Sequence, residues 1–221
     1  MGGGNTAQAV SGFVRMSVDT RTRLAVFPLA GAVLFPRMHL PLHIFEPRYR
    51  AMVQHALSTD QRIGMVQPRA ADSLPPLFNM GCVGKIVHVE ALDDGRYNIV
   101  LEGQSRFRLT RELEVTTAFR QVEAELVEDV TDPNLGLLER SSIEREARRF
   151  AERQGYVVDW DAVSRLDDEA LVNGIAQVAP FDPAAKQALL EADNLASRAD
   201  LIVQLMQFFG RHDGDSGVTL Q

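Results

Sequence analysis

The chain of 221 residues is poor in the groups from which disulfides, metal sites and membrane spans are built. Its single cysteine, Cys82, excludes an intramolecular disulfide, which fits a reducing cytoplasm. His39 and His43 are spaced as metal ligands on a helix would be, but Pro41 lies between them and breaks any helix. No apolar run reaches the roughly 18 residues that a membrane-spanning helix needs, and no signal peptide opens the chain. We therefore expect a cytoplasmic protein with no metal, no cofactor and no membrane contact.

Catalytic motifs are missing as well. Residues 81–85 contain glycines and a lysine but lack the phosphate-loop pattern Gly-x-x-x-x-Gly-Lys-Ser/Thr, and they have the character of a strand. Residues 103–105 complete only half of a Gly-x-Ser-x-Gly elbow. Cys82 and His88 would share one face of a strand because their separation is even, yet a buried thiol and a solvated histidine are the simpler interpretation. We expect no catalytic residues and no enzymatic activity.

Charge is distributed unevenly along the sequence. The net charge is −7, and the acidic excess lies in the second half, whereas the first half is close to neutral. A basic stripe of the kind that binds nucleic-acid phosphates is absent from both halves. This balance argues against a nucleic acid as partner. The near-neutral first half nevertheless leaves RNA or small-ligand binding open as the alternative function.

The first half of the chain has the period of β-structure. An Asp-Gly pair at Asp94 and Gly95 separates two β-rich runs and predicts a hairpin. One helix is expected after Glu46, with Pro47 in its first turn. Several short strands at close spacing indicate a small barrel or rolled sheet. The expected strands cover residues 24–29, 63–67, 81–91, 97–101, 105–109 and 119–127.

The second half has the period of helices, and about four are expected. The first ends at Gly155, the second is capped by Asp167, the third by Asp182 with Pro183 in its first turn, and the fourth by Asn194 or Ser197. The fourth helix should stop at Gly210. The sequence thus predicts an α+β protein. Its expected parts are a leader at 1–20, a barrel at 21–130, a helical subdomain at 131–210 and a disordered tail at 211–221.

The leader allows two interpretations. Residues 2–6 formally match the N-myristoylation pattern. The glycine-rich start and the absence of any period favour a flexible leader or a tag remnant instead. A mass measurement on the native N-terminus distinguishes the two.

Residues 26–49 are the most informative segment. Four prolines interrupt an otherwise apolar run, so the segment forms short extended pieces and turns. The run, and above all Ile-Phe-Glu-Pro-Arg-Tyr at 44–49, resembles the opening of the Lon protease N-terminal, or substrate-binding, domain family. These six residues are typical of stand-alone members that lack the ATPase and protease parts. Further similar segments are 63–66, 81–86, 95–103, 106–108, 166–173 and 180–191.

The resemblance implies a PUA-like β-barrel followed by a helical subdomain. It also implies a non-catalytic role in protein quality control, in which the domain contacts exposed hydrophobic stretches of unfolded or damaged polypeptides. Partners would then be such polypeptides and an ATP-dependent protease, which the chain would serve as an adaptor or with which it would compete.

The binding surface is expected within the same proline-rich segment. It holds too many apolar side chains for one face, so most should be core and a subset should form an exposed patch. Arg37, Arg48, Arg50 and Arg106 would rim that patch, and methionines would suit varied partners. The candidate polypeptide-binding residues are Leu34, Phe35, Pro36, Met38, Phe45, Arg48 and Met52.

Overall fold

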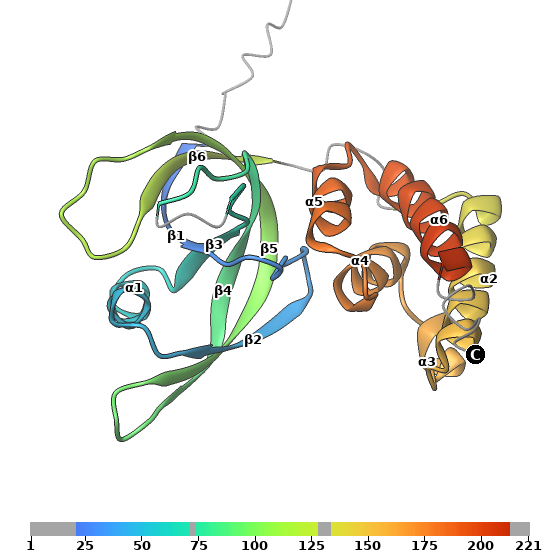
Figure 1. The fold of residues 1–221 in the computed structure, drawn as a ribbon, viewed down its shortest axis with the longest axis horizontal. Coiled ribbons are helices and arrows are strands. Elements are labelled where there is room, and N and C mark those ends of the chain that lie inside the picture. The colour runs from blue at the N-terminus through green and yellow to red at the C-terminus, as the bar shows by residue number, and fades with distance from the viewer. Residues whose placement is uncertain (1–20, 71–73, 128–133, 213–221) are drawn as a thin grey trace, which may run out of the picture.

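The computed structural model describes residues 21–70, 74–127 and 134–212, and it has two parts that lie side by side (Figure 1). The first part holds six strands and one helix, and the second holds helices only. The α+β class with C-terminal helices is therefore confirmed. The strands are β1 (Arg21–Pro28), β2 (His39–Ile44), β3 (Arg62–Val66), β4 (Met80–Ala91), β5 (Tyr97–Glu112) and β6 (Gln121–Val127). The helices are α1 (Pro47–Leu57), α2 (Leu137–Gln154), α3 (Trp160–Ser164), α4 (Asp168–Val178), α5 (Pro183–Glu191) and α6 (Leu195–His212).

The strands close into a barrel because β5 is long enough to pair along both of its ends. The order is β2-β5-β4-β3-β1-β6, and a further pairing of β5 with β6 closes the ring. Residues 97–102 of β5 pair with β2, and residues 106–112 pair with β6. The β1–β3 pair is parallel and the other pairs are antiparallel. Among the described strands, β2 pairs with β5 alone, so one of its edges is open.

Local signals in the sequence fix most element ends. Asp167 accepts a hydrogen bond from Ala170 N at 2.8 Å, and the carboxylate of Asp182 does the same for α5. Asn194 rather than Ser197 caps α6, and Gly155 ends α2 in the left-handed conformation. α6 continues past Gly210 to His212, two residues beyond the predicted stop. The predicted leader, the boundary near residue 130 and residues 213–221 lie outside the described residues.

The number of helices differs in detail from the sequence prediction. Five helices, not about four, follow the barrel, because the short helix α3 is held by Asp159, which accepts hydrogen bonds from two backbone N–H groups. The simpler interpretation of Cys82 and His88 is confirmed, because Cys82 is fully buried and His88 is exposed. His88 lies in the last part of β4, where residues 87–91 are all exposed, and β4 carries register irregularities between Cys82 and Gly84 and between Ile86 and His88.

The proline-rich loop forms the junction between the barrel and the helices. Phe35 is fully buried, and its backbone N–H donates to Gln177 Oε1 at 3.2 Å. Pro36 O accepts from Asn173 Nδ2 at 3.1 Å, so two side chains of α4 hold the loop. Arg37 adds a two-pronged ion pair to Asp167, with N–O distances of 2.9 and 2.8 Å. The loop therefore ties α4 to the barrel.

A second set of polar contacts joins α5 to the barrel. Arg106 of β5 is 2% exposed and donates to the carbonyl oxygens of Leu190, Ala192 and Asp193 at 2.8, 2.6 and 3.3 Å. These carbonyls lie at the C-terminal end of α5, where a helix leaves its acceptors unsatisfied. Gln187 of α5 donates to Met80 O at 3.1 Å. The two parts are thus fastened by buried hydrogen bonds and not by apolar packing alone.

The Arg37–Asp167 pair should make stability depend on acidity. The pKa of Asp167 is lowered, first by the hydrogen bond from Arg37 and then by that from the Ala170 backbone. A carboxyl group with a depressed folded pKa stabilises the fold above its unfolded pKa of about 3.9, and the contribution is lost as pH falls through the folded pKa. We expect Asp167→Asn, which keeps a capping side chain, to lower the free energy of unfolding at pH 7 by under about 1 kcal/mol, because the pair is exposed.

The measurement is urea denaturation of both proteins between pH 7 and pH 2. The difference should shrink through the acidic range and vanish at its lower end. Asp182→Asn, which changes the cap of α5 without touching Arg37, is the control. An equal, pH-dependent loss in that control would assign the effect to helix capping and contradict the ion-pair explanation.

Candidate functional site

The structure buries four of the seven predicted polypeptide-binding residues. Leu34 is 1% exposed, Phe35 and Met52 are fully buried, and Pro36 is buried as well. The reason is that the loop is pressed between the barrel and α4, while Met52 faces inward from α1. Arg106, expected at the rim of the patch, is also buried. These five residues serve the core and the junction, so the predicted patch does not exist as a surface.

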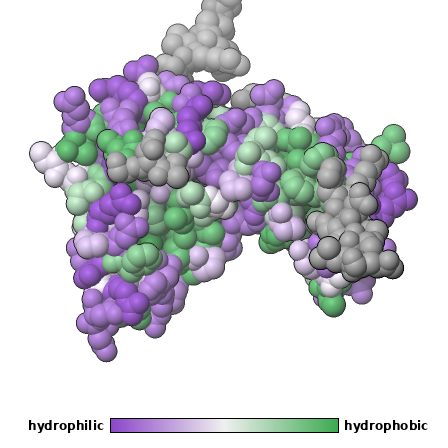
Figure 2. Space-filling model, viewed as in Figure 1, coloured by the Kyte–Doolittle hydropathy of each residue, from purple (hydrophilic) through white to green (hydrophobic). Residues whose placement is uncertain are grey.

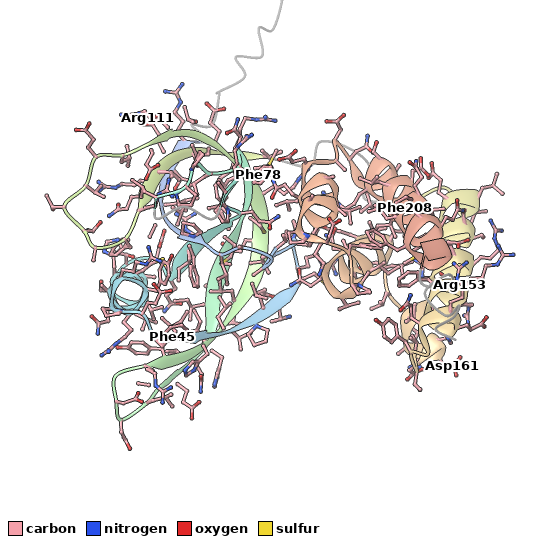
Figure 3. All side chains as sticks on the ribbon, in the orientation of Figure 1. Phe45, Phe78, Arg111, Arg153, Asp161 and Phe208 are labelled. Carbon is pink, nitrogen blue, oxygen red and sulfur yellow. The ribbon has the colours of Figure 1, made fainter. Side chains whose placement is uncertain are left out.

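The other three predicted residues do reach the surface, but not together. Met38 and Phe45 flank the two ends of β2, which places them about 20 Å apart along an extended strand. Met38 is half-buried and lies beside Gly174 of α4. Phe45 is 60% exposed at the lower end of the barrel in Figure 3, and Arg48 lies 4.5 Å above the ring of Tyr49. They are isolated contacts and not one site.

An apolar hollow lies within the helical part. Its volume is about 630 Å³, inside the range of about 300–1,000 Å³ typical of ligand pockets. It opens between α2, α3, α4 and the start of the loop after α2, and α6 contributes Met206. Its lining residues are Ala147, Phe150, Ala151, Tyr156, Val158, Trp160, Val163, Leu166, Leu171, Gly174, Ile175, Val178, Ala179 and Met206. We call this the helical pocket.

Small residues at helical spacing leave the space open. Ala147 and Ala151 lie one turn apart on α2, and Gly174 of α4 has no side chain to fill the gap. The five-residue α3 is too short to cover the opening, although Trp160 and Val163 reach its wall. The hollow is therefore a consequence of how these helices are spaced.

The rim of the helical pocket is apolar and exposed. Val178 is 80% exposed, Tyr156 is 50% and Leu166 is 41%, and each lines the opening. Figure 2 shows hydrophobic residues in green around α4 and α3 on this side of the molecule. Contiguous exposed apolar surface around a hollow marks an interaction site more often than single exposed side chains do.

One arginine of α2 lies at the wall of the helical pocket. The guanidinium of Arg148 lies 4.4 Å above the ring of Trp160, a cation–π contact at the pocket wall. Arg149 and Arg153 are also exposed and share the buried carboxylate of Glu146, at 3.8 and 3.1 Å. The lining itself holds no acid, base or nucleophile other than the phenol of Tyr156. Such a site can bind an apolar group but has no means to transform it.

A second hollow of about 330 Å³ lies on the outer face of β2, β4 and β5. There His43 Nδ1 lies 2.7 Å from Asn98 Oδ1 and His43 Nε2 lies 3.2 Å from an Arg96 nitrogen. His88 is at its wall. Within the described ranges no three His, Cys, Asp or Glu side chains come together as metal ligands, and no helix there is long and apolar enough to cross a membrane.

Comparison with known families decides what kind of domain this is. Residues 23–207 match the family described as the ATP-dependent protease La (LON) substrate-binding domain. The chain belongs to this family. Among the Lon relatives, Lon protease 2 of Myxococcus xanthus is 29% identical over 215 residues, which are 91% of this chain and 25% of that protein. Lon protease of Escherichia coli strain K12 is 26% identical over 200 residues, with 85% and 25% covered. The chain thus spans about a quarter of the length of these relatives.

Solved structures of Lon N-terminal domains share the fold. The N-terminal domain of Mycobacterium avium complex Lon protease aligns with a TM-score of 0.64 at 18% identity, covering 84% of this chain and 98% of that one. The Lon N-terminal domain protein from Xanthomonas campestris aligns with the same TM-score at 21% identity, covering 85% and 98%. The family match extends over the substrate-binding domain alone.

Sequence reasoning missed the helical pocket of this Lon domain. Residues 156–166 show neither the helical nor the strand period, so the sequence predicts no element there, yet they supply Tyr156, Trp160 and Leu166. One signal was present: a Tyr-Val-Val run directly after the stop at Gly155, outside any amphipathic helix. Apolar residues that no periodic element can bury are a sign of a surface site.

Proposed function

We propose that this Lon substrate-binding domain binds exposed apolar segments of unfolded or damaged polypeptides, and that the helical pocket receives their side chains. The observation that carries the proposal is an apolar hollow of about 630 Å³ whose rim is itself apolar and exposed. A folded protein buries its large apolar side chains, whereas an unfolded one exposes them. The pocket would therefore bind unfolded proteins in preference to folded ones. The flexible Met206 in its wall suits partners of varied shape.

The expected affinity is modest. Each fully buried valine- or leucine-sized side chain gains about 1.5–3 kcal/mol, and ordering an extended segment costs part of that gain. Three or four such side chains gain roughly 5–12 kcal/mol, and a net of about 5–7 kcal/mol after this cost corresponds to dissociation constants from about 10 to 200 μM. Binding of this strength is tolerant of sequence and quickly reversible, as suits a domain that samples many chains.

The direct test is a titration with one model protein in two forms, permanently denatured and native. Trp160 is the only tryptophan of the chain and lies in the pocket wall, so its emission reports binding when the partner has no tryptophan. We expect a saturable change with the denatured form and none with the native form. Equal, negligible responses to both forms at concentrations up to about 100 μM would remove the proposal.

A matched pair of variants locates the site. Val178→Lys places a charge on the pocket rim at the last residue of α4, where a cation is compatible with the helix dipole. We expect it to weaken binding of the denatured protein about tenfold, since one buried apolar contact of about 1.4 kcal/mol or more is lost. Val87→Lys makes the same change at a valine of β4 that is 47% exposed and distant from the pocket lining.

The control variant should bind as the parent chain does, and circular dichroism should show both variants folded. Loss of binding with Val87→Lys, and none with Val178→Lys, would move the site to the barrel. In that case Phe45 and Arg48, which remain proposed contacts at the barrel surface, would be the next residues to replace.

An adaptor role in the cytoplasm extends the proposal. A chain that holds an apolar segment could raise the local concentration of a damaged protein at an ATP-dependent protease, or compete with that protease for it. Degradation of a denatured substrate by a purified Lon protease, with and without an excess of this chain, separates the two. A faster rate supports delivery, a slower rate supports competition, and an unchanged rate contradicts both.

A further inference from the structure

We propose that a polar pocket at one end of the barrel binds the phosphate group of a small molecule. The pocket has a volume of about 370 Å³ and is lined from β1, the end of α1 and the turn after it, the start of β3 and the beginning of β6 with the loop before it. We call it the barrel pocket. Figure 1 shows α1 and the loop between β5 and β6 on the side of the barrel away from the helical part. The barrel pocket shares no lining residue with the helical pocket, so the proposal does not depend on the proposed function.

Two arginines in the wall of the barrel pocket are each fixed through the Nε atom. Arg23 Nε donates to Gln121 Oε1 at 2.6 Å, and Arg62 Nε donates to Asp60 Oδ2 at 2.6 Å. Each guanidinium also carries two terminal NH₂ groups. Within the described part of the chain, these terminal groups of Arg23 and Arg62 make no hydrogen bond or ion pair. Both arginines are thus held in place with a fork of donors that a ligand can use.

The support of Arg23 belongs to the core. Gln121 is 3% exposed, and its Nε2 donates to Thr117 Oγ1 at 3.1 Å. The Thr117 hydroxyl in turn donates to Phe119 O at 2.8 Å. Because both ends of the Gln121 amide are engaged, its oxygen stays directed at Arg23. A buried amide that fixes an exposed arginine lowers the cost of ordering that arginine around a ligand.

The barrel pocket is positively charged within an acidic protein. Its lining holds two arginines and one aspartate, a balance of +1 when His55 is neutral, whereas the whole chain carries −7. The aspartate, Asp60, is paired with Arg62. Glu123 lies opposite Arg23 in the register of β1 and β6, but its carboxylate is bound by Arg111 at 2.7 Å. Among the residues that the structure describes, no carboxylate therefore neutralises Arg23.

The C-terminal end of α1 borders the barrel pocket without exposing free carbonyl groups to an anion. His55 O accepts from Ser58 Oγ at 2.8 Å and from Thr59 Oγ1 at 2.9 Å. Ala56 O accepts from the backbone N–H of Thr59 at 3.1 Å. The partial negative charge of this helix end is therefore reduced. The imidazole of His55, whose centroid lies 5.3 Å from that of Phe119, lines the pocket and adds a further polar group near the arginines.

A phosphate group matches this set of donors better than a carboxylate does. One guanidinium fork satisfies the two oxygens of a carboxylate, whereas a phosphate monoester offers three acceptor oxygens and a charge approaching −2. Two forks can therefore address a phosphate from two sides. The volume lies near the lower end of the range for ligand pockets, about 300–1,000 Å³, which leaves room for a small organic part beside the phosphate. The net charge of −7 disfavours a nucleic acid as the source of the phosphate.

The experiment is an NMR titration of the ¹⁵N-labelled full chain, in which the arginine Nε–H signals are followed at constant ionic strength. The probes are glycerol 3-phosphate, inorganic phosphate and, as the control without phosphate, glycerol. We expect glycerol 3-phosphate to shift the Arg23 and Arg62 signals saturably, with a dissociation constant on the order of 1 mM. Inorganic phosphate should shift the same signals more weakly, and glycerol should leave them unchanged.

Three outcomes would overturn the proposal. If neither phosphate compound gave a saturable shift, or if sodium chloride produced the same shifts, the barrel pocket would hold no phosphate site. Tighter binding of inorganic phosphate than of glycerol 3-phosphate would assign the pocket to the free ion. Tighter binding of a hydroxyl-ended oligoribonucleotide than of either compound would assign the surface to a nucleic acid.

A matched set of arginine variants locates the site. Arg62 and Arg96 have the same local geometry, because each donates from Nε to an oxygen of the aspartate two positions before it at 2.6 Å. Arg62 lines the barrel pocket and Arg96 does not. We expect Arg62→Gln and Arg23→Gln each to weaken binding of glycerol 3-phosphate about tenfold, since a charge-assisted contact is lost. Arg96→Gln should change it by less than about twofold, because a distant exposed charge is screened.

The NMR spectrum of each variant also shows whether it is folded, so loss of binding is separated from loss of structure. Arg23→Lys keeps the charge but not the fork, and its affinity should lie between those of the parent chain and Arg23→Gln. Equal weakening by Arg62→Gln, Arg23→Gln and Arg96→Gln would show that only the net charge of the chain matters and would contradict a site in the barrel pocket.

Discussion

Replacing Gly103 with alanine should cost the fold about 3 kcal/mol or more, because the added methyl group would meet backbone and not a movable side chain. The proline-rich loop crosses directly over this position of β5. Gly103 N donates to Met38 O at 2.8 Å, and Gly103 O accepts from Arg37 N at 2.7 Å. A Cβ atom there would lie 2.8 Å from the carbonyl carbon of Phe35 and closer still to its oxygen.

Urea denaturation and the melting temperature measure this effect. A loss of about 3 kcal/mol should lower the melting temperature by about 6–12 °C in a domain of this size. Gly174→Ala is the matched control: a Cβ atom there meets only Met38 Sδ, at 3.8 Å, and the position is inside α4. It should raise stability by about 0.5–1 kcal/mol, since alanine favours a helix over glycine. The two substitutions should change the free energy of unfolding in opposite directions. A Gly103→Ala variant as stable as the parent chain would contradict the close crossing of loop and strand.

Replacing Arg106 with alanine should have a comparable effect through a different cause. The side chain is buried and supplies hydrogen bonds to three carbonyl groups at the end of α5. Each buried acceptor left without a donor costs about 1–3 kcal/mol, and the packing of the long side chain is lost too. We expect Arg106→Ala to destabilise the protein by about 3–5 kcal/mol. The stability of Arg106→Lys should lie between those of the parent chain and Arg106→Ala, because a lysine keeps the charge but cannot present a planar fork of donors.

The measurement follows the two parts separately during urea denaturation. Trp160 emission reports the helices, and circular dichroism reports the whole fold. We expect the Trp160 transition to separate from the other in Arg106→Ala, because the fastening of α5 to the barrel is lost. Arg108→Ala, an exposed arginine on the same strand, should change stability by no more than about 0.5 kcal/mol. Equal losses in the two variants would show that the junction does not depend on Arg106.

Features governed by neighbours in sequence could be predicted, and features governed by distant contacts could not. The caps Asp167 and Asp182 and the stop at Gly155 depend on one turn of backbone, so the sequence identifies them. The prolines at 28, 36, 41 and 47 correctly excluded a long helix, and most of the apolar side chains around them are indeed core. Which of these side chains are exposed depends on α4, whose Asn173 lies 137 positions away from Pro36.

The helical pocket was beyond prediction for the same reason. It exists because Ala147, Ala151 and Gly174 leave space on helices that are far apart in sequence. Each of them is an ordinary helix residue when considered alone. Arg106 was expected at the surface because arginine is rarely buried, and only the carbonyl groups at the end of α5 explain its position.

Pro41 disfavours unwanted strand pairing at the open edge of the barrel, which matters for a domain whose proposed partners are unfolded polypeptides. It lies in the middle of β2, whose outer edge is unpaired. Because proline has no backbone N–H, this position cannot donate a hydrogen bond to a strand of another chain. A polypeptide that paired with the open edge of β2 would therefore miss one hydrogen bond at Pro41, which disfavours extension of the sheet. If the chain binds unfolded polypeptides as proposed, this interruption would keep it from joining their aggregates through β2.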